Sequence, residues 1–471
     1  MFRLNFPHKL SYVLFCVLYL CSSCNTERKN EKTDPPNIIL INVDDLGYGD
    51  TEIYGNSDFD TPHILQLASQ GMTFTNAYAA AANCAPSRAC LLTGQYSPRH
   101  GVYTVGSSER GHSKDRKLIP VENIEVLGDS VITLAHEFQR NGYRTMMIGK
   151  WHLGDDPSVH GFDVNIAGNH AGHPKSYFSP YGNPDLADGP EGEYLTDRLT
   201  REAISLIEKS DEPFFLYLAY YAVHTPLQGK PELVAKYLEQ GMEDKTARYA
   251  AMVENLDTNL GLLFKSMDRL KLIENTLIVF TSDNGGIAAI HPQLPWRAGK
   301  GSYFEGGIRV PMIVSWPGKI PSGSISDLPV INLDLYPTLL SISGIDPQNP
   351  ILDGMDISRE WNGDKMNRER SLFWHFPVYL QAYDGKTDDA RDELFRTRPG
   401  TALRMGPWKI HHYFESDEWE LYNLESDPGE RMNLWDQETD VGQKLKAQLE
   451  SWRQETNAAI PTQPNPEFQN S

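Results

Sequence analysis

The chain has 471 residues, of which 40% are hydrophobic, and it contains 37 glycines and 31 prolines. This length and composition allow a large core with many loops and exclude a disordered or fibrous protein. Its 63 acidic residues outnumber its 43 lysines and arginines and give a formal net charge of −20, so we expect no nucleic acid among its partners. The same charge repels anions at long range, so any anion site must gather cations locally.

The N-terminal residues have the pattern of a targeting segment. Arg3 and Lys9 precede a short apolar run over residues 12–20, and small residues follow up to Cys24. A run of this length is typical of a secretory signal and is too short to predict a membrane span. Ser22 and Ser23 before Cys24 resemble a bacterial lipobox, which predicts a lipidated Cys24.

We therefore expect a signal peptide of the lipoprotein type over residues 1–23 and a polar tether over residues 24–36. The expected location is the periplasm or the outer membrane of a bacterium, with the membrane as a partner through the lipid anchor. A simple cleaved signal and an uncleaved anchor are the alternatives.

Four apolar runs in the rest of the chain end in polar or charged residues. They cover residues 37–43, 144–148, 214–220 and 276–281, and their composition is that of buried parallel strands. Helical stretches, such as 130–141 and 196–208, lie between them. This alternation predicts an α/β fold with a mostly parallel sheet covered on both faces. Because ligands bind beyond the carboxyl ends of such strands, we expect the polar residues there to converge on one crevice.

Acidic and amide residues follow two of these strands. Asp44 and Asp45 come directly after the run that ends at Val43, and Asp283 and Asn284 come shortly after the run 276–281. A set made only of oxygen ligands suits a hard divalent cation better than zinc. Either pair taken alone is more often a turn or a helix cap. Their occurrence together favours a metal site.

A compact motif lies between these strands, in the segment 83–94, Asn-Cys-Ala-Pro-Ser-Arg-Ala-Cys-Leu-Leu-Thr-Gly. It resembles the signature of the sulfatase family, Cys-x-Pro-Ser-Arg followed by Thr-Gly. The resemblance implies that a formylglycine-generating or sulfatase-maturing enzyme converts Cys84 to formylglycine, whose hydrate is the nucleophile. A disulfide between Cys84 and Cys90, or a small buried hydrophobic side chain, is the alternative.

Further blocks match the same family: Gly-Lys-x-His at 149–152, His-Thr-Pro from His224, and the glycine-rich stretch 299–311 with Lys300. The resemblance implies an alkaline phosphatase-like fold, with a large mostly parallel sheet between helices and a smaller C-terminal antiparallel sheet. It also implies that one Ca²⁺ (magnesium in some accounts) is held by Asp44, Asp45, Asp283, Asn284 and the residue derived from Cys84.

The implied reaction is the cleavage of the S–O bond of a sulfate monoester by the formylglycine hydrate. The metal, Arg88, Lys150 and Lys300 would neutralise the charge on the transferring group. By the same resemblance, His224, assisted by Lys300, would protonate the leaving alcohol, and His152 would be the base that allows sulfate to leave.

The C-terminal part changes character, with fewer apolar runs after Arg370. Residues 402–410 and 420–424 resemble the small C-terminal sheet of sulfatases, and a helix is expected over 441–456. We therefore predict a catalytic domain over residues 37–362 and a C-terminal subdomain over 363–471.

Substrate-binding residues are expected outside these motifs, in segments that mix histidine, arginine and aromatic side chains as sugar sites do. The candidates are His170, His173, Arg297 and His375. Loop packing is the alternative for each of them. For an exported sulfatase the expected substrate is a sulfated polysaccharide or oligosaccharide, such as marine algal ulvan or a sulfated galactan.

Other functions remain open at this point. An arylsulfatase would act on small sulfate esters. A phosphatase or phosphonate hydrolase of the same superfamily would require a Ser or Thr nucleophile and more metal ligands. A lipoprotein that only binds sulfated glycans would not need Cys84, Lys150, His152 and His224 together. A redox or zinc site built on Cys84 and Cys90 lacks a CxxC pattern.

Overall fold

The computed structural model of the protein describes residues 35–469, which belong to one compact unit. The expected signal peptide, Cys24 and nearly all of the expected tether lie outside the described residues. Within the described part, no helix is both long and apolar enough to cross a membrane.

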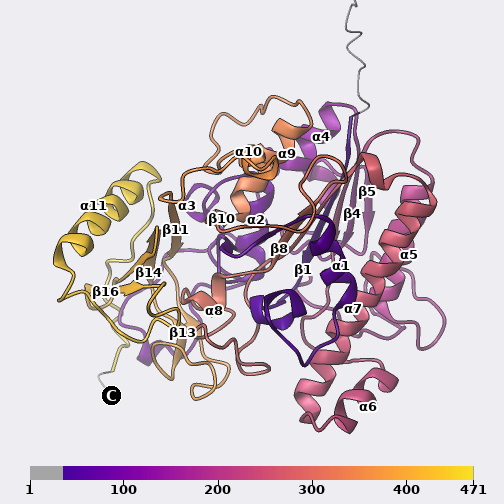
Figure 1. Cartoon of the computed structure of the whole chain (residues 1–471). Helices are drawn as coiled ribbons and strands as arrows, with labels where there is room; N and C mark the ends of the chain where they lie inside the picture. The colour runs from indigo at the N-terminus through magenta and orange to yellow at the C-terminus, as the bar shows by residue number, and fades with distance from the viewer. Residues whose placement is uncertain (1–34, 470–471) are drawn as a thin grey trace, which may run out of the picture. The chain divides into compact units, whose positions relative to one another are not determined.

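An eight-stranded sheet with the order β5-β4-β6-β1-β7-β8-β2-β9 forms the centre of the fold (Figure 1). Its strands are β1 Asn37–Val43, β2 Met72–Phe74, β4 Arg144–Gly149, β5 Val164–Ile166, β6 Phe214–Ala219, β7 Thr276–Ser282, β8 Met312–Ser315 and β9 Ser324–Ser326. Only β8 runs antiparallel to its neighbours, β7 and β2. The four predicted strands are the adjacent parallel strands β4, β6, β1 and β7. The prediction of a mostly parallel sheet is therefore confirmed.

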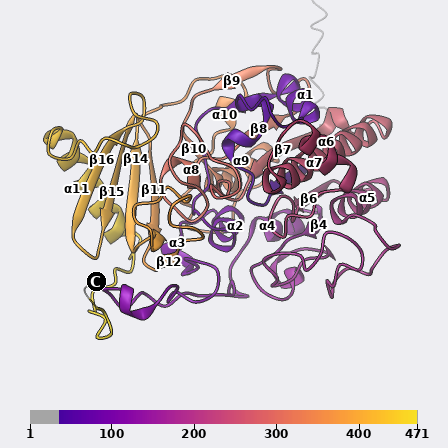
Figure 2. The ribbon, with the colours of Figure 1, turned by 90° about the horizontal axis from the view of Figure 1, so that it is seen from below.

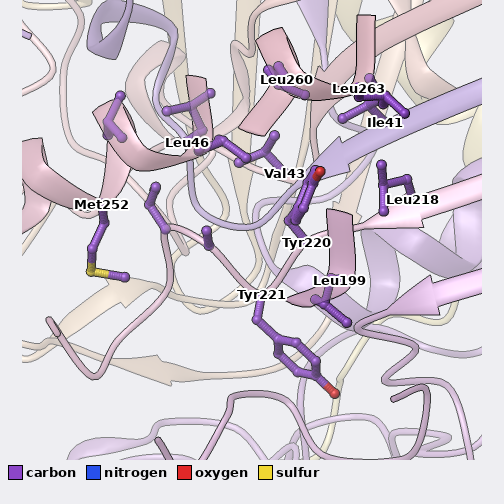
Figure 3. Close-up of a cluster of buried hydrophobic side chains, with 14 of the residues drawn as sticks. Ile41, Val43, Leu46, Leu199, Leu218, Tyr220, Tyr221, Met252, Leu260 and Leu263 are labelled. Atoms are coloured by element: carbon purple, nitrogen blue, oxygen red, sulfur yellow. The ribbon is translucent and has the colours of Figure 1, made fainter. Parts of the chain in front are cut away.

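Helices cover both faces of this sheet. Along β1, Ile39, Ile41 and Val43 enter a core that contains buried side chains of α1, α5 and α7 (Figure 3). Ile38 and Leu40 point the other way, into a second core with side chains of α2, α4 and α9. Because successive side chains of a strand point to opposite faces, an all-apolar strand can supply both cores at once.

The α-helices are α1 Pro62–Gln70, α2 Cys84–Thr93, α3 Ser97–His100, α4 Leu134–Arg140, α5 Leu195–Glu208, α6 Pro231–Glu239, α7 Asp244–Arg269, α8 Glu305–Ile308, α9 Leu335–Ile342, α10 Ser358–Trp361 and α11 Thr439–Glu455. Short 3-10 turns are η1 Tyr48–Asp50, η2 Glu52–Tyr54, η3 Ser113–Asp115, η4 Pro157–His160, η5 Ile273–Asn275 and η6 Asn332–Asp334. The expected helix 130–141 is shorter than predicted because Thr133 caps it, its side chain accepting a hydrogen bond from the backbone of His136.

A second, antiparallel sheet has the order β11-β14-β15-β16. Its strands are β11 Ser371–Phe376, β14 Gly400–Met405, β15 Trp408–Tyr413 and β16 Glu418–Asn423. Helix α11 packs on it through Leu445 and Leu449, and both views place this helix on the side away from α5 and α7 (Figures 1 and 2). The predicted combination of a large sheet with a small C-terminal antiparallel sheet is confirmed. The division at residues 362 and 363 stays a prediction.

Two pairs of short strands complete the fold. β3 Ala77–Tyr78 pairs with β10 Val330–Ile331, and β12 Leu380–Gln381 pairs with β13 Phe395–Thr397. The core of the small sheet also contains Tyr78 and Cys90 from the N-terminal half of the chain. The C-terminal part is therefore joined to the rest by a shared hydrophobic core.

Candidate active site

Polar residues converge at the carboxyl ends of the four central strands. Lys150 follows β4, His224 follows β6, Asp44 and Asp45 follow β1, and Asp283 and Asn284 follow β7. Backbone hydrogen bonds align these ends: the Asp283 amide donates to the carbonyl of Val43, and the Lys150 amide donates to that of Ala219. The crevice predicted from the strand pattern is therefore present.

Cys84 is the first residue of α2 and lies at the edge of this cluster. The residue is 2% exposed, and its Sγ is 4.0 Å from Oδ1 of Asp45. Burial raises the pKa of the Cys84 thiol, but the charges of Lys150 and Lys300 outweigh burial and lower it to about 6. Cys84 and Cys90 are both free, so they form no disulfide.

Three buried carboxylates are each matched by a buried cation. Lys150 Nζ is 2.7 Å from Asp44 Oδ2, and Lys300 Nζ is 2.7 Å from the Asp45 carboxylate. Arg88 donates through Nε to Asp283 Oδ2 at 2.8 Å, with its Nη2 at 2.7 Å from the same atom. Arg88 also donates to the Lys150 carbonyl at 2.8 Å, so it joins the α2 segment to the ends of β4 and β7.

The acidic cluster has the chemistry of a divalent cation site. Ligand atoms of Asp44, Asp45, Cys84 and His224 lie within 4.8 Å of one another. Oδ1 of Asp44 and Oδ1 of Asn284 are buried and have no hydrogen-bond partner among the described residues. Burial raises the pKa of Asp44 well above its ordinary value, against the charge of Lys150, and the charge of Asp283 raises it further. A bound cation would satisfy the two free oxygens and relieve this repulsion.

Two site residues have backbone conformations that are unusual for residues other than glycine. The φ angle of Asp45 is 61° and that of His152 is 64°. Such left-handed conformations cost about 1–3 kcal/mol each and persist where the surrounding structure fixes them. The turn at Asp45 lets successive carboxylates pair with different lysines, Asp44 with Lys150 and Asp45 with Lys300.

The two histidines have different surroundings. Burial, together with the nearby charges of Lys150 and Arg88, lowers the pKa of His152 well below its ordinary value. His224 Nδ1 is 2.7 Å from the carbonyl of Thr225, so Nδ1 carries a hydrogen, and Nε2 is 3.5 Å from Oδ2 of Asp45. Burial and the Lys300 charge lower the pKa of His224, but the carboxylates of Asp45 and Asp44 outweigh them and raise it.

A cavity of about 120 Å³ opens onto this cluster. Cys84, His152, His224 and Lys300 line it. Further lining side chains come from other loops and from the short strands β12 and β13, and they are Asn83, Val105, Arg110, His173, Leu380, Tyr383 and Arg396. The structure therefore places the expected nucleophile, both expected acid–base groups and one expected sulfate-binding lysine around a single cavity.

The four expected substrate residues fall into two groups. His173 lines the cavity with its ring 6.1 Å from that of His224, and the His170 ring lies 6.3 Å from that of His152. Arg297 donates to carbonyls of Asp389, Ala390 and Glu430, outside the cavity. His375 is 2% exposed, and its ring nitrogens contact Thr401 Oγ1 and the Ala459 carbonyl. Internal contacts account for Arg297 and His375, and nothing in their placement supports a substrate role.

Three prominent cavity residues were absent from the sequence prediction: Arg110, Tyr383 and Arg396. Arg396 belongs to β13, Tyr383 follows β12, and Arg110 lies in the loop before η3. A bridge between Glu109 and Tyr379 brings these distant segments together. No motif marks these residues, and only the tertiary structure places them at the cavity.

The chain matches the sulfatase family over residues 36–345 and the family described as N-sulphoglucosamine sulphohydrolase, C-terminal, over residues 299–455. It is 31% identical to a sulfatase of Formosa agariphila, over 95% of this chain and 94% of the relative. It is also 31% identical to the N-acetylgalactosamine-6-sulfatase of Canis lupus familiaris, over 85% of this chain and 76% of the relative.

Solved structures agree with these matches. The structure of Ps i-CgsB in complex with k-i-k-neocarrahexaose superposes with a TM-score of 0.75 at 30% identity, covering 93% of this chain and 96% of the other. The signature around Cys84, the buried strand-end cluster and these matches lead to one conclusion: the chain belongs to the sulfatase family and is a sulfuric ester hydrolase.

Proposed function

We propose that this sulfatase removes sulfate from a sulfated polysaccharide or oligosaccharide, with formylglycine derived from Cys84 as the nucleophile and one Ca²⁺ at the acidic cluster. The observation that carries the proposal is the position of Cys84: it begins α2, lines the cavity and lies 4.0 Å from Asp45. The relatives named for galactosamine sulfate and the similar structure with a bound saccharide support a carbohydrate substrate. Ulvan and sulfated galactans are therefore the first polymers to test.

The chain's own residues would divide the work as follows. When present, the formylglycine hydrate would supply an oxygen nucleophile, and Ca²⁺, held by Asp44, Asp45, Asp283 and Asn284, would polarise the sulfate oxygens. Lys300 would hold a sulfate oxygen from the cavity wall, and Lys150 and Arg88 would fix the carboxylates behind it.

The proton transfers would use the two histidines of the cavity. His224 would hold a proton at Nε2 for the leaving alcohol, since its Nδ1 hydrogen is already committed to the Thr225 carbonyl. His152 would accept a proton, because burial and the neighbouring cations keep its ring neutral.

The decisive experiment measures the mass of the peptide that contains residue 84, from protein expressed with and without a sulfatase-maturing enzyme. We expect an aldehyde or its hydrate, and sulfate release from saccharides, only with the maturing enzyme. Cys90→Ala is the matched control, because Cys90 is buried in the neighbouring core and does not line the cavity. Active protein with an intact Cys84 thiol would refute the mechanism.

The alternatives of an arylsulfatase and of a phosphatase or phosphonate hydrolase are tested on the same protein. Matured enzyme is assayed with 4-nitrophenyl sulfate, the corresponding phosphate and phosphonate esters, and sulfated saccharides. A kcat/KM highest for the saccharides supports the proposal, and a kcat/KM highest for the nitrophenyl sulfate favours the arylsulfatase. Cys84 occupies the position at which a phosphatase would need a Ser or Thr nucleophile, and this argues against the phosphatase.

We further propose that the protein is exported and anchored by lipid at Cys24 in the periplasm or outer membrane of a bacterium. The support is the basic, apolar and small-residue pattern that ends at Cys24. Expression of the full chain with membrane fractionation tests it. The chain should be found in the membrane fraction, and Cys24→Ala should release it or leave the signal uncleaved.

A further inference from the structure

Two arginines line the cavity without an acidic partner. No carboxylate within residues 35–469 lies at ion-pair distance from Arg110 or Arg396, whereas Arg88 in the same site is paired with Asp283. The chain has 63 acidic residues, so unpaired arginines here do not reflect a shortage of acids. An unpaired cation in a cavity that already contains Lys300 is costly unless a ligand balances it.

The protein holds the two guanidinium groups close together through one residue. Arg110 Nε donates to the side-chain Oε1 of Gln381 at 3.0 Å, and Arg396 Nε donates to the Gln381 carbonyl at 3.0 Å. Arg110 Nη1 donates to the Val105 carbonyl at 2.8 Å, and Arg396 Nη1 donates to the Lys300 carbonyl at 3.1 Å. All four acceptors are neutral, so they orient the cations without neutralising them.

Each guanidinium keeps one group free for a ligand. Nη2 of Arg110 and Nη2 of Arg396 have no hydrogen-bond partner in the described part of the chain. The Arg396 guanidinium also stacks on the Tyr383 ring, 3.5 Å from its centroid, and the residue is 5% exposed. Burial, followed by the charge of Arg396, lowers the pKa of Arg110, which records the repulsion between the two cations.

We propose that Arg110 and Arg396 bind a second anionic group of the substrate, a carboxylate or a second sulfate, close to the sulfate that is cleaved. The Arg396 contact with the Lys300 carbonyl ties this subsite to the lysine expected to hold the reacting sulfate. Guanidinium groups suit both carboxylate and sulfate, because their planar N–H groups match paired oxygens. The inference rests on the proposed carbohydrate function and specifies it: the preferred saccharide carries two anions, not one.

The test compares three otherwise matched saccharides that carry the reacting sulfate alone, with a second sulfate, or with a carboxylate. The measured quantity is the preference, the ratio of kcat/KM for a dianionic substrate to kcat/KM for the monoanionic one. Wild-type enzyme should prefer one dianionic substrate, and Arg110→Gln should lower that preference about 10- to 100-fold, the range of one charge-assisted hydrogen bond. The dianionic saccharide that the wild-type enzyme prefers identifies the second anion as sulfate or carboxylate.

Matched variants separate a specific role from a loss of charge. Arg110→Lys keeps the charge without the planar donors and should lose part of the preference. Arg396→Gln should act like Arg110→Gln. Arg248→Gln removes one charge from the surface of α7, where Arg248 pairs with Asp244, and should leave the preference unchanged. An equal preference in wild type, Arg110→Gln and Arg396→Gln would overturn the inference.

Binding measurements distinguish this inference from the proposed function. Calorimetry with the three saccharides is run on Cys84→Ala protein, with and without Arg110→Gln, so that turnover plays no part. Tighter binding of a dianionic saccharide that Arg110→Gln abolishes supports the subsite even if matured enzyme releases no sulfate. Equal binding of all three saccharides overturns the subsite even if matured enzyme hydrolyses all of them.

Discussion

His152 and His224 line the same cavity, but only His224 has a carboxylate beside its ring. Its Nε2 lies 3.5 Å from Asp45, whereas Nδ1 of His152 is buried without a hydrogen-bond partner among the described residues. A group that donates a proton to the leaving alcohol matters most when that alcohol is a poor leaving group. The fall in activity on replacing His224 should therefore depend on the leaving group of the substrate, and the fall on replacing His152 should not.

We expect His224→Ala to lower kcat/KM for a sugar sulfate about 10²- to 10⁴-fold and for 4-nitrophenyl sulfate much less, because nitrophenolate leaves without protonation. His152→Ala should lower turnover of both substrates to a similar extent. Steady-state kinetics on matured enzyme measures both. Equal losses on both substrates for His224→Ala would refute its assignment as the acid.

Some of the site residues can be predicted from the sequence, and others cannot. The position after an apolar strand, together with the family motifs, identifies Asp44 and Lys150, because the carboxyl ends of parallel strands meet at one edge of the sheet. Arg110 lies in a loop and Arg396 on the three-residue strand β13, and these segments meet through long-range contacts such as the bridge from Glu109 to Tyr379, so no local pattern marks them. His375 shows the converse, since a histidine among aromatic residues has a core role here.

At the scale of elements, the end of β4 must turn sharply to present Lys150. Gly149 has a φ of 101°, and a Cβ there would lie 1.9 Å from the Ala219 carbonyl oxygen. We expect Gly149→Ala to destabilise the protein by well over the cost of positive φ alone, about 1 kcal/mol, and to lower kcat by displacing Lys150. Denaturant unfolding and kinetics on the same samples measure both effects.

Gly142→Ala is the control for this experiment. Gly142 also has a positive φ, 80°, but nothing lies within 4 Å of the position of its Cβ. The Gly142→Ala substitution should lower the unfolding free energy by about 1 kcal/mol and leave kcat unchanged. If the unfolding free energy falls equally in the two variants, the close approach of residue 149 to Ala219 is not the reason for a glycine at this position.

Long apolar runs predicted the central strands, but not the order in which they pair. Strands β2 and β9 have only three residues each, too few for a periodic pattern to stand out from loops. β2 pairs with β8, and β9 pairs with β2, so this edge of the sheet joins segments from distant parts of the chain. The expected helix 130–141 was too long because a threonine cap, not the apolar pattern, sets where α4 begins.

At the scale of the whole molecule, a buried ion cluster joins the catalytic part to the C-terminal sheet. Lys409 Nζ on β15 lies 2.9 Å from Glu305 on α8 and 3.0 Å from Glu430, and all three side chains are fully buried. We expect Lys409→Met to destabilise the chain by about 3–5 kcal/mol, because it removes the fully buried cation that two buried carboxylates share and leaves Glu305 with Arg309 alone. Urea unfolding measures it, with Lys444→Met on the exposed face of α11 as the control.

The same cluster predicts a pH dependence. Burial raises the pKa of Glu305, but the charges of Lys409 and Arg309 outweigh it and hold this pKa below its ordinary value. A carboxyl with a lowered pKa stabilises the fold above its unfolded-state pKa, and this stability is lost as the pH falls below that value. Glu305→Gln should therefore flatten the loss of unfolding free energy on acidification. If the unfolding free energy of Glu305→Gln falls as steeply as that of wild type between neutral pH and pH about 3, this prediction is wrong.

The proposed calcium site also depends on the whole fold, because its expected ligands follow both β1 and β7 and come together only when the sheet forms. A ligand that binds only the folded chain stabilises it by about 2.7 kcal/mol at a free concentration 100 times its Kd. We therefore expect the Tm to rise with CaCl2 and to fall again with a chelator.

Asp283→Asn should reduce this rise in Tm. Asp257→Asn is the control, because Asp257 is a buried aspartate that contacts His63 instead, and it should retain the rise. An equal Tm rise in wild type and Asp283→Asn would place the calcium elsewhere.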